Sequence, residues 1–167
     1  MIRFLFFSTL VSLLCLGCGE EHGHHGHNHG GGESVEEEAC EHMSEDSSSQ
    51  TIAGATEGEA TNTEAADWLH LRNEVTLTAD GEEFMGYVTL EIGTAGSHQL
   101  FANHPVEVTI GGIAASSTSP VDECTEVEAV YVYELPVGEY VLFARADQEK
   151  VALVLEFPGG HDDHGDH

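Results

Sequence analysis

The chain has 167 residues and carries 31 Asp and Glu against 4 Lys and Arg, which gives a formal net charge of -27 at pH 7. This balance excludes direct binding of nucleic acid, because the chain cannot neutralise a row of phosphates, and it excludes a polybasic contact with anionic lipid. The length suits about one domain, and a hydrophobic fraction of 40% is enough for a folded core.

Residues 1–17 are predicted to be an export signal. A single cation, Arg3, precedes an apolar run over residues 4–16. The run is too short to cross a bilayer as a helix, which needs about 20 residues. It ends at Gly17 and Cys18, and a small residue directly before a cysteine resembles the lipobox of bacterial lipoproteins.

That resemblance implies cleavage before Cys18, a lipid on this cysteine and anchoring to a membrane. The next residue is Gly19 rather than an acidic residue, which, by resemblance to Gram-negative lipoproteins, implies sorting to the outer membrane, facing the periplasm. The pattern covers the first 18 residues and departs from the family at Cys15, where Leu is usual. A plain secretory signal is the alternative.

Residues 18–66 are predicted to form a disordered, acidic, His-rich tether. Gly, Ser, Thr, Ala, Glu and His dominate the segment, and its sizeable apolar side chains are Val35, Met43 and Ile52. Such a segment buries too little apolar surface to offset the entropy of ordering. A short helix over residues 34–43 would be marginal on its own.

Residues 67–158 are predicted to form an all-β domain. Apolar residues alternate in short runs, at 75–79, 88–92, 106–110, 130–133 and 140–144. The run 151–155 is apolar on both faces, which indicates a central strand. Turn signals separate the runs, at 80–81, 93–97, 111–112 and 136–138. About seven strands in this length favour an antiparallel β-sandwich of Ig-like or prealbumin-like type, with a small barrel as the alternative.

The segment from Leu135 to Tyr140 reads Leu-Pro-Val-Gly-Glu-Tyr. It resembles the corner of fibronectin type III domains and, more closely, the L-P-x-G-x-Y hairpin of prealbumin-like bacterial domains. In that hairpin the glycine supplies a turn and the tyrosine packs over it. The resemblance supports a sandwich and implies nothing about function.

Two cysteines remain if Cys15 leaves with the signal and Cys18 takes lipid. These are Cys40 and Cys124. An exported compartment is oxidising, so the two could form a disulfide that closes a long loop. Free thiols or metal ligation are the alternatives.

Five histidines fall within eight residues near the start of the predicted tether: His22, His24, His25, His27 and His29. Imidazole is a common ligand for zinc, copper and nickel, and the intervening glycines let a short backbone wrap around an ion. The segment resembles the histidine-rich segments of bacterial zinc- and nickel-handling proteins, which implies collection or storage of ions. A low-complexity spacer is the alternative.

The tail, residues 159–167, repeats this chemistry with three imidazoles and three carboxylates: His161, Asp162, Asp163, His164, Asp166 and His167. These groups could bind zinc through mixed nitrogen and oxygen ligands at about 2.0–2.2 Å. The two histidine-rich segments could also converge on one ion.

Isolated histidines inside the predicted domain, His70, His98 and His104, are expected to be surface or hydrogen-bonded residues rather than ligands. Cys124 and Glu126 could join them in a site. The chain has no cupredoxin loop, EF-hand loop, H-E-x-x-H or G-x-S-x-G motif. No catalytic residue is assigned, and we expect a protein that is not an enzyme.

These features predict a lipid-anchored envelope protein that binds or buffers a divalent transition metal. Zinc is the first expectation, with copper and nickel as alternatives. The membrane, metal ions and another envelope protein are the expected partners. The alternative is a structural or protein-interaction sandwich module of the envelope whose metal binding is incidental.

Overall fold

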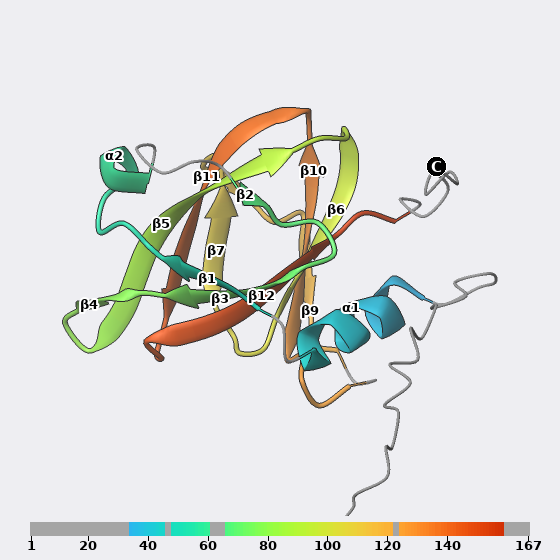
Figure 1. Ribbon diagram of the computed structural model, residues 1–167, viewed down its shortest axis with the longest axis horizontal. Coiled ribbons are helices and arrows are strands. Elements are labelled where there is room, and N and C mark those ends of the chain that lie inside the picture. The colour runs from blue at the N-terminus through green and yellow to red at the C-terminus, as the bar shows by residue number, and fades with distance from the viewer. Residues whose placement is uncertain (1–33, 46–47, 61–65, 122–123, 159–167) are drawn as a thin grey trace, which may run out of the picture.

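The computed structural model describes residues 34–45, 48–60, 66–121 and 124–158 (Figure 1). The predicted signal, Cys18 and both histidine-rich segments lie outside the described residues. Two helices and twelve strands form in this part of the chain, in this order: α1 Val35–Ser44, β1 Ser49–Ile52, α2 Glu57–Ala60, β2 Ala66–Asp67, β3 Arg72–Thr76, β4 Thr78–Asp80, β5 Glu83–Ile92, β6 Gly96–Ala102, β7 Glu107–Ile110, β8 Ile113–Ala114, β9 Ser117–Ser119, β10 Ala129–Leu135, β11 Gly138–Ala146 and β12 Lys150–Glu156.

The strands form two sheets that face each other as a β-sandwich, which confirms the predicted fold class. The first sheet has the order β1-β3-β12-β6-β10-β9, and the second has the order β2-β5-β11-β7-β8 with β4 paired to β5. Most neighbours are antiparallel, while β1 with β3 and β2 with β5 are parallel. No described helix is long and apolar enough to span a membrane.

Alternation along the strands directs one set of side chains into the main core between the sheets. Leu90, Leu142 and Leu153 are fully buried there, as is Trp68 just before β3. Strand β12 is central, between β3 and β6, as the apolar run 151–155 predicts. None of the apolar runs that predict strands covers β6, and its first two residues, 96 and 97, fall in the predicted turn 93–97.

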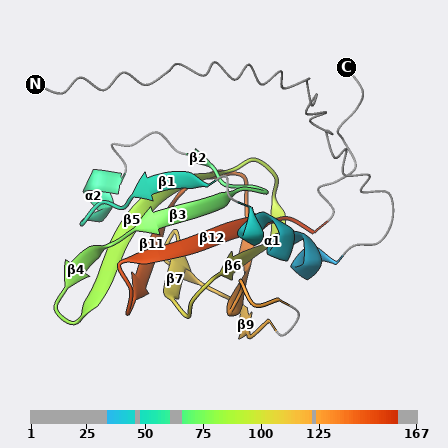
Figure 2. The ribbon, with the colours of Figure 1, turned by 60° about the horizontal axis from the view of Figure 1, so that its bottom comes forward.

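A second apolar cluster explains why β12 is buried on both faces. Helix α1 lies across the outer face of the first sheet and contacts β12 (Figure 2). Ala39 and Met43 of the helix pack there against Phe101, Ala152 and Val154. The second face of β12 is therefore covered by a segment that precedes the predicted domain.

The expectation of a disordered tether is thus wrong for residues 34–45 and 48–60. Ser34 caps α1 by accepting a hydrogen bond from the Glu37 amide at 3.2 Å, and the first turn is acidic, which suits the helix dipole. Strand β1 adds to the edge of the first sheet. The helix is marginal by its own propensity, so packing on the sheet supplies its stability.

Cys40 of α1 and Cys124 form a disulfide, with Cα atoms 6.0 Å apart and a sequence separation of 84 residues. The sequence leaves open a disulfide, two free thiols or metal ligation, and the structure shows the disulfide. It fastens the helix to the segment that leads into β10.

The Leu-Pro-Val-Gly-Glu-Tyr segment forms a corner rather than the expected hairpin. Strand β10 belongs to the first sheet and β11 to the second, so the chain crosses between sheets at this point. The packing of the tyrosine is as expected. Tyr140 donates its hydroxyl proton to the Pro136 carbonyl at 2.9 Å, and its ring lies against Gly138, whose φ of 155° favours glycine.

Candidate metal centre

Helix α1 presents two potential ligands on one face. Glu38 and His42 are four residues apart, which places them one turn from each other. Nε2 of His42 lies 3.7 Å from Oε1 of Glu38. The apolar stripe of Ala39 and Met43 packs on the sheet beside them, so the ligand pair is held at the boundary between helix and sandwich.

The last residue of β12 supplies a third side chain, and its burial follows from the strand period. Glu156 shares a face with Ala152 and Val154, the face that α1 covers. Its side chain is only 1% exposed. A carboxylate is thereby placed under the helix at the end of an otherwise apolar row.

The fourth side chain, His70, lies in the short loop between Trp68 and β3. Its backbone amide donates to the Leu155 carbonyl at 3.0 Å, which ties the loop to the end of β12. Its φ is 57°, and it is the sole non-glycine residue with positive φ in the described part of the chain. This left-handed conformation costs of the order of 1 kcal/mol and is typical of functional positions.

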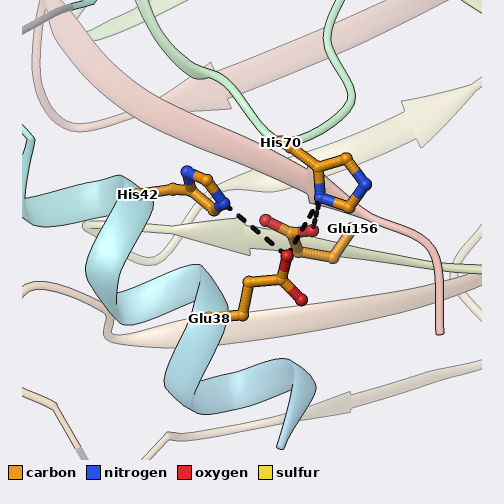
Figure 3. A group of neighbouring side chains, drawn as sticks. All are labelled: Glu38, His42, His70 and Glu156. Carbon is orange, nitrogen blue, oxygen red and sulfur yellow. Dashed lines mark ion pairs between the residues drawn. The ribbon is translucent and has the colours of Figure 1, made fainter. Parts of the chain in front are cut away.

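These four side chains converge from three separate segments (Figure 3). Nδ1 of His70 lies 2.5 Å from Oε2 of Glu156 and 3.3 Å from Oε1 of Glu38. One ligand atom from each of Glu38, His42, His70 and Glu156 lies within 4.8 Å of the others. We call these four residues the α1–β12 centre.

The electrostatics of the α1–β12 centre favour a cation. Burial raises the pKa of Glu156, and the negative charge of Glu38 adds to this effect, while the hydrogen bond and charge of His70 oppose it. Oε1 of Glu156 makes no hydrogen bond within the described residues. When both carboxylates are deprotonated and both imidazoles are neutral, the four side chains carry a charge of about -2. A bound divalent ion would neutralise this charge.

The donor set also restricts the class of ion. Two nitrogen and two oxygen donors suit zinc, and imidazole equally suits copper and nickel, whereas calcium takes six to eight oxygens. Bonds of about 2.0–2.2 Å in a tetrahedron place donor atoms about 3.4 Å apart. Three of the donor separations are 2.5, 3.3 and 3.7 Å, and all four atoms lie within 4.8 Å of one another, so binding one ion would require the side chains to rotate.

Of the isolated histidines considered in the sequence, the structure brings only His70 into this group. His98 is buried, with Nδ1 3.0 Å from the Gly96 carbonyl, and His104 faces Glu128 at 3.6 Å. Both fit the expected hydrogen-bonded or surface role. Cys124 is in the disulfide rather than a site, and Glu126 lines a shallow hollow beside His104.

The sequence interpretation missed Glu38, His42 and Glu156. The spacing of Glu38 and His42 was a usable signal, because a carboxylate and an imidazole four apart on a helix share one face. The prediction of a disordered tether over residues 18–66, with only a marginal helix at 34–43, obscures this signal. Glu156 at the end of a buried strand was a second signal, since charged residues are rarely buried without a partner.

Comparison with known proteins yields no family: no family model matches the chain. No curated protein matches it either.

Proposed function

We propose that this protein is a lipid-anchored protein of the bacterial cell envelope that binds or buffers a divalent transition metal, with zinc as its principal ion. The observation that carries the proposal is the convergence of two histidines and two carboxylates in the α1–β12 centre. A buried carboxylate and a left-handed histidine are both unfavourable to folding, and a bound cation would offset them.

The histidine-rich segments support the same function by their position in the sequence. His29 precedes Glu38 by nine residues, and His161 follows Glu156 by five. Each segment is therefore covalently attached close to a ligand of the centre. Tethering at this spacing raises the effective concentration of the captured ion near the centre. In this proposal the segments collect ions and the centre holds one of them.

The test uses the full-length chain in mild detergent, altered so that the centre can be measured alone. Cys15 and Cys18 are changed to Ser, and the eight histidines of the two segments are changed to Gln; we call this the test chain. We expect calorimetry to show one zinc ion bound per test chain. His70→Gln and Glu156→Gln should each weaken binding at least about tenfold, because each removes a ligand.

His104→Gln is the matched control, because His104 is exposed to a similar extent and also faces a glutamate. It should leave the zinc affinity unchanged. A test chain that binds no zinc, or one whose binding survives both ligand substitutions, would show that the α1–β12 centre is not a metal site.

A further inference from the structure

Two cross-links would join α1 to the sandwich when the proposed metal is bound. One is the disulfide between Cys40 and Cys124. The other is the metal itself, which would connect Glu38 and His42 of the helix with His70 and Glu156 of the sandwich. Cys40 lies midway in sequence between the two helical ligands.

The arrangement of side chains around α1 places these cross-links on either side of its buried stripe. Successive residues of a helix turn by 100°, so Ala39 and Met43 lie between the ligand pair Glu38 and His42 and the disulfide at Cys40. The proposed metal would therefore fix one side of the helix, and the disulfide fixes the other. A displacement of the helix at the disulfide would also displace Glu38 and His42.

Besides the disulfide, α1 is held by the packing of a short buried stripe and by the Arg72 side chain, which donates to the Glu45 carbonyl at 3.1 Å. The ten residues of the helix are too few to be stable alone, and the buried side chains that it contributes to the second cluster are Ala39 and Met43. Cys40 and Cys124 are 84 residues apart in sequence, so the disulfide closes a long loop. It thereby restricts the conformations that the chain can adopt when the helix is detached from the sheet. The ligands on β12 and in the loop before β3 remain in place when the helix moves.

We infer that the Cys40–Cys124 disulfide controls the α1–β12 centre: it holds the helical ligands in place, and its reduction releases the metal. This inference rests on the proposed function. A dithiol supplies the two electrons. Its thiolate attacks one sulfur, the Cys40–Cys124 bond breaks, the second thiol closes a ring disulfide in the reductant, and each cysteine ends as a protonated thiol. The metal keeps its oxidation state throughout.

Coupling of this kind is reciprocal. If the disulfide strengthens zinc binding by a given factor, bound zinc must favour the disulfide over the two thiols by the same factor. We expect a factor of at least about ten, within the usual range for coupled sites.

The first measurement compares zinc affinity of the test chain in its oxidised and reduced forms. The reduced form is prepared with dithiothreitol and desalted under nitrogen, because the reductant itself binds zinc. We expect affinity to fall at least about tenfold on reduction. Equal affinity in both forms overturns the inference but leaves the proposed function standing, whereas no binding by the oxidised form overturns the proposed function.

A second variant separates the loss of the bridge from the gain of thiols. Freed thiolates are themselves zinc ligands, so tighter binding by the reduced form would also contradict the inference. Cys40→Ser combined with Cys124→Ser removes both the bridge and the thiols, and it should bind zinc as weakly as the reduced form. Retention of the sandwich is checked by circular dichroism.

The reciprocal measurement does not depend on the serine variant. The test chain is equilibrated in glutathione buffers with and without excess zinc, and free thiols are alkylated and counted by mass spectrometry. Zinc should shift the balance toward the disulfide at least about tenfold. An unchanged balance would overturn the inference even if the serine variant does not fold.

Discussion

Nδ1 of His70 lies 2.5 Å from Oε2 of Glu156, so a loop histidine with a left-handed backbone is paired with a buried carboxylate at the end of a central strand. Neither side chain belongs to the main core between the sheets. The main core is formed by other residues of the two sheets. A pair that is unfavourable to folding and lies outside the core is expected at a binding site.

Glu156→Leu should therefore stabilise the metal-free chain while impairing zinc binding. Leucine would continue the apolar row of Ala152 and Val154 under α1 and would remove the desolvation cost of a buried carboxylate. His70, the remaining partner, is 25% exposed and can be hydrated, so we expect a net gain of about 1 kcal/mol. Urea unfolding in the presence of a chelator measures the gain. Glu139→Leu, on an exposed position of β11, should stay within about 0.5 kcal/mol. A less stable Glu156→Leu chain would mean that the carboxylate is a structural requirement.

Stability should fall in acid because of His98. Burial lowers the pKa of this side chain from 6.5, although its contacts with Gly96 and the charge of Glu134 oppose the effect. Below pH 6.5 the unfolded chain therefore binds a proton that the folded chain does not, and the free energy of unfolding decreases as the pH falls toward the folded-state pKa.

The check is urea unfolding of the intact chain and of His98→Gln at pH 7.5, 6.5 and 5.5. The difference between the two should change with pH below 6.5, with a slope of at most about 1.4 kcal/mol per pH unit. Parallel pH profiles would show that His98 does not contribute.

The segment before residue 67 should be required for full stability. A fragment of residues 67–158 lacks α1 and β1, exposes Phe101 and Val154, and loses the Cys40–Cys124 bridge. We expect it to remain all-β by circular dichroism but to be at least about 3 kcal/mol less stable than residues 34–158. Equal stability of the two fragments would mean that α1 contributes nothing to the fold.

Deletions of the histidine-rich segments should change zinc capacity in proportion to their imidazoles. Removing residues 22–29 deletes five histidines and should remove most of the capacity, while removing residues 161–167 deletes three and should remove less. The losses add if the segments act separately. The double deletion should keep one ion at the α1–β12 centre. Undiminished stoichiometry in calorimetry would exclude a role for the segments.

Cys18→Ala should abolish acylation, since the lipid is expected on this cysteine. Labelling of cells with a palmitate analogue, followed by purification of the chain, measures it. Ser44→Ala, a change on the exposed end of α1, serves as the control and should label normally. Continued labelling of Cys18→Ala would overturn the lipoprotein interpretation.

The strands could be predicted where apolar and polar residues alternate with a period of two, because this pattern indicates a strand with one buried face. This holds for β5 and β11, and the continuous run of β12 correctly indicated a central strand. Strand β6 was harder to recognise because it begins with Gly, Ser and His, and its pairing with β10 and β12 rather than its composition buries it.

The α1–β12 centre could not be predicted from local sequence patterns, because its four side chains come together only through tertiary contacts. Helix α1 is stabilised by Phe101, Cys124 and Val154, residues far downstream that no window around Glu38 contains. His70 gave no signal of its own, since its orientation depends on a left-handed backbone that the sequence did not indicate. The metal ligands predicted from the sequence therefore lie in segments outside the described residues, and none of them belongs to the α1–β12 centre.

The helix at residues 35–44 also changes the distance at which a lipid anchor would hold the folded body. A tether ending at residue 66 would contain 48 residues after Cys18 and could extend to about 170 Å. The described fold includes Ser34, which 15 residues separate from Cys18, and the greatest reach of 15 residues is about 55 Å. An acylated chain would therefore keep Ser34, at the start of the helix that carries Glu38 and His42, within about 55 Å of the bilayer, where the α1–β12 centre would sample ions near the membrane surface.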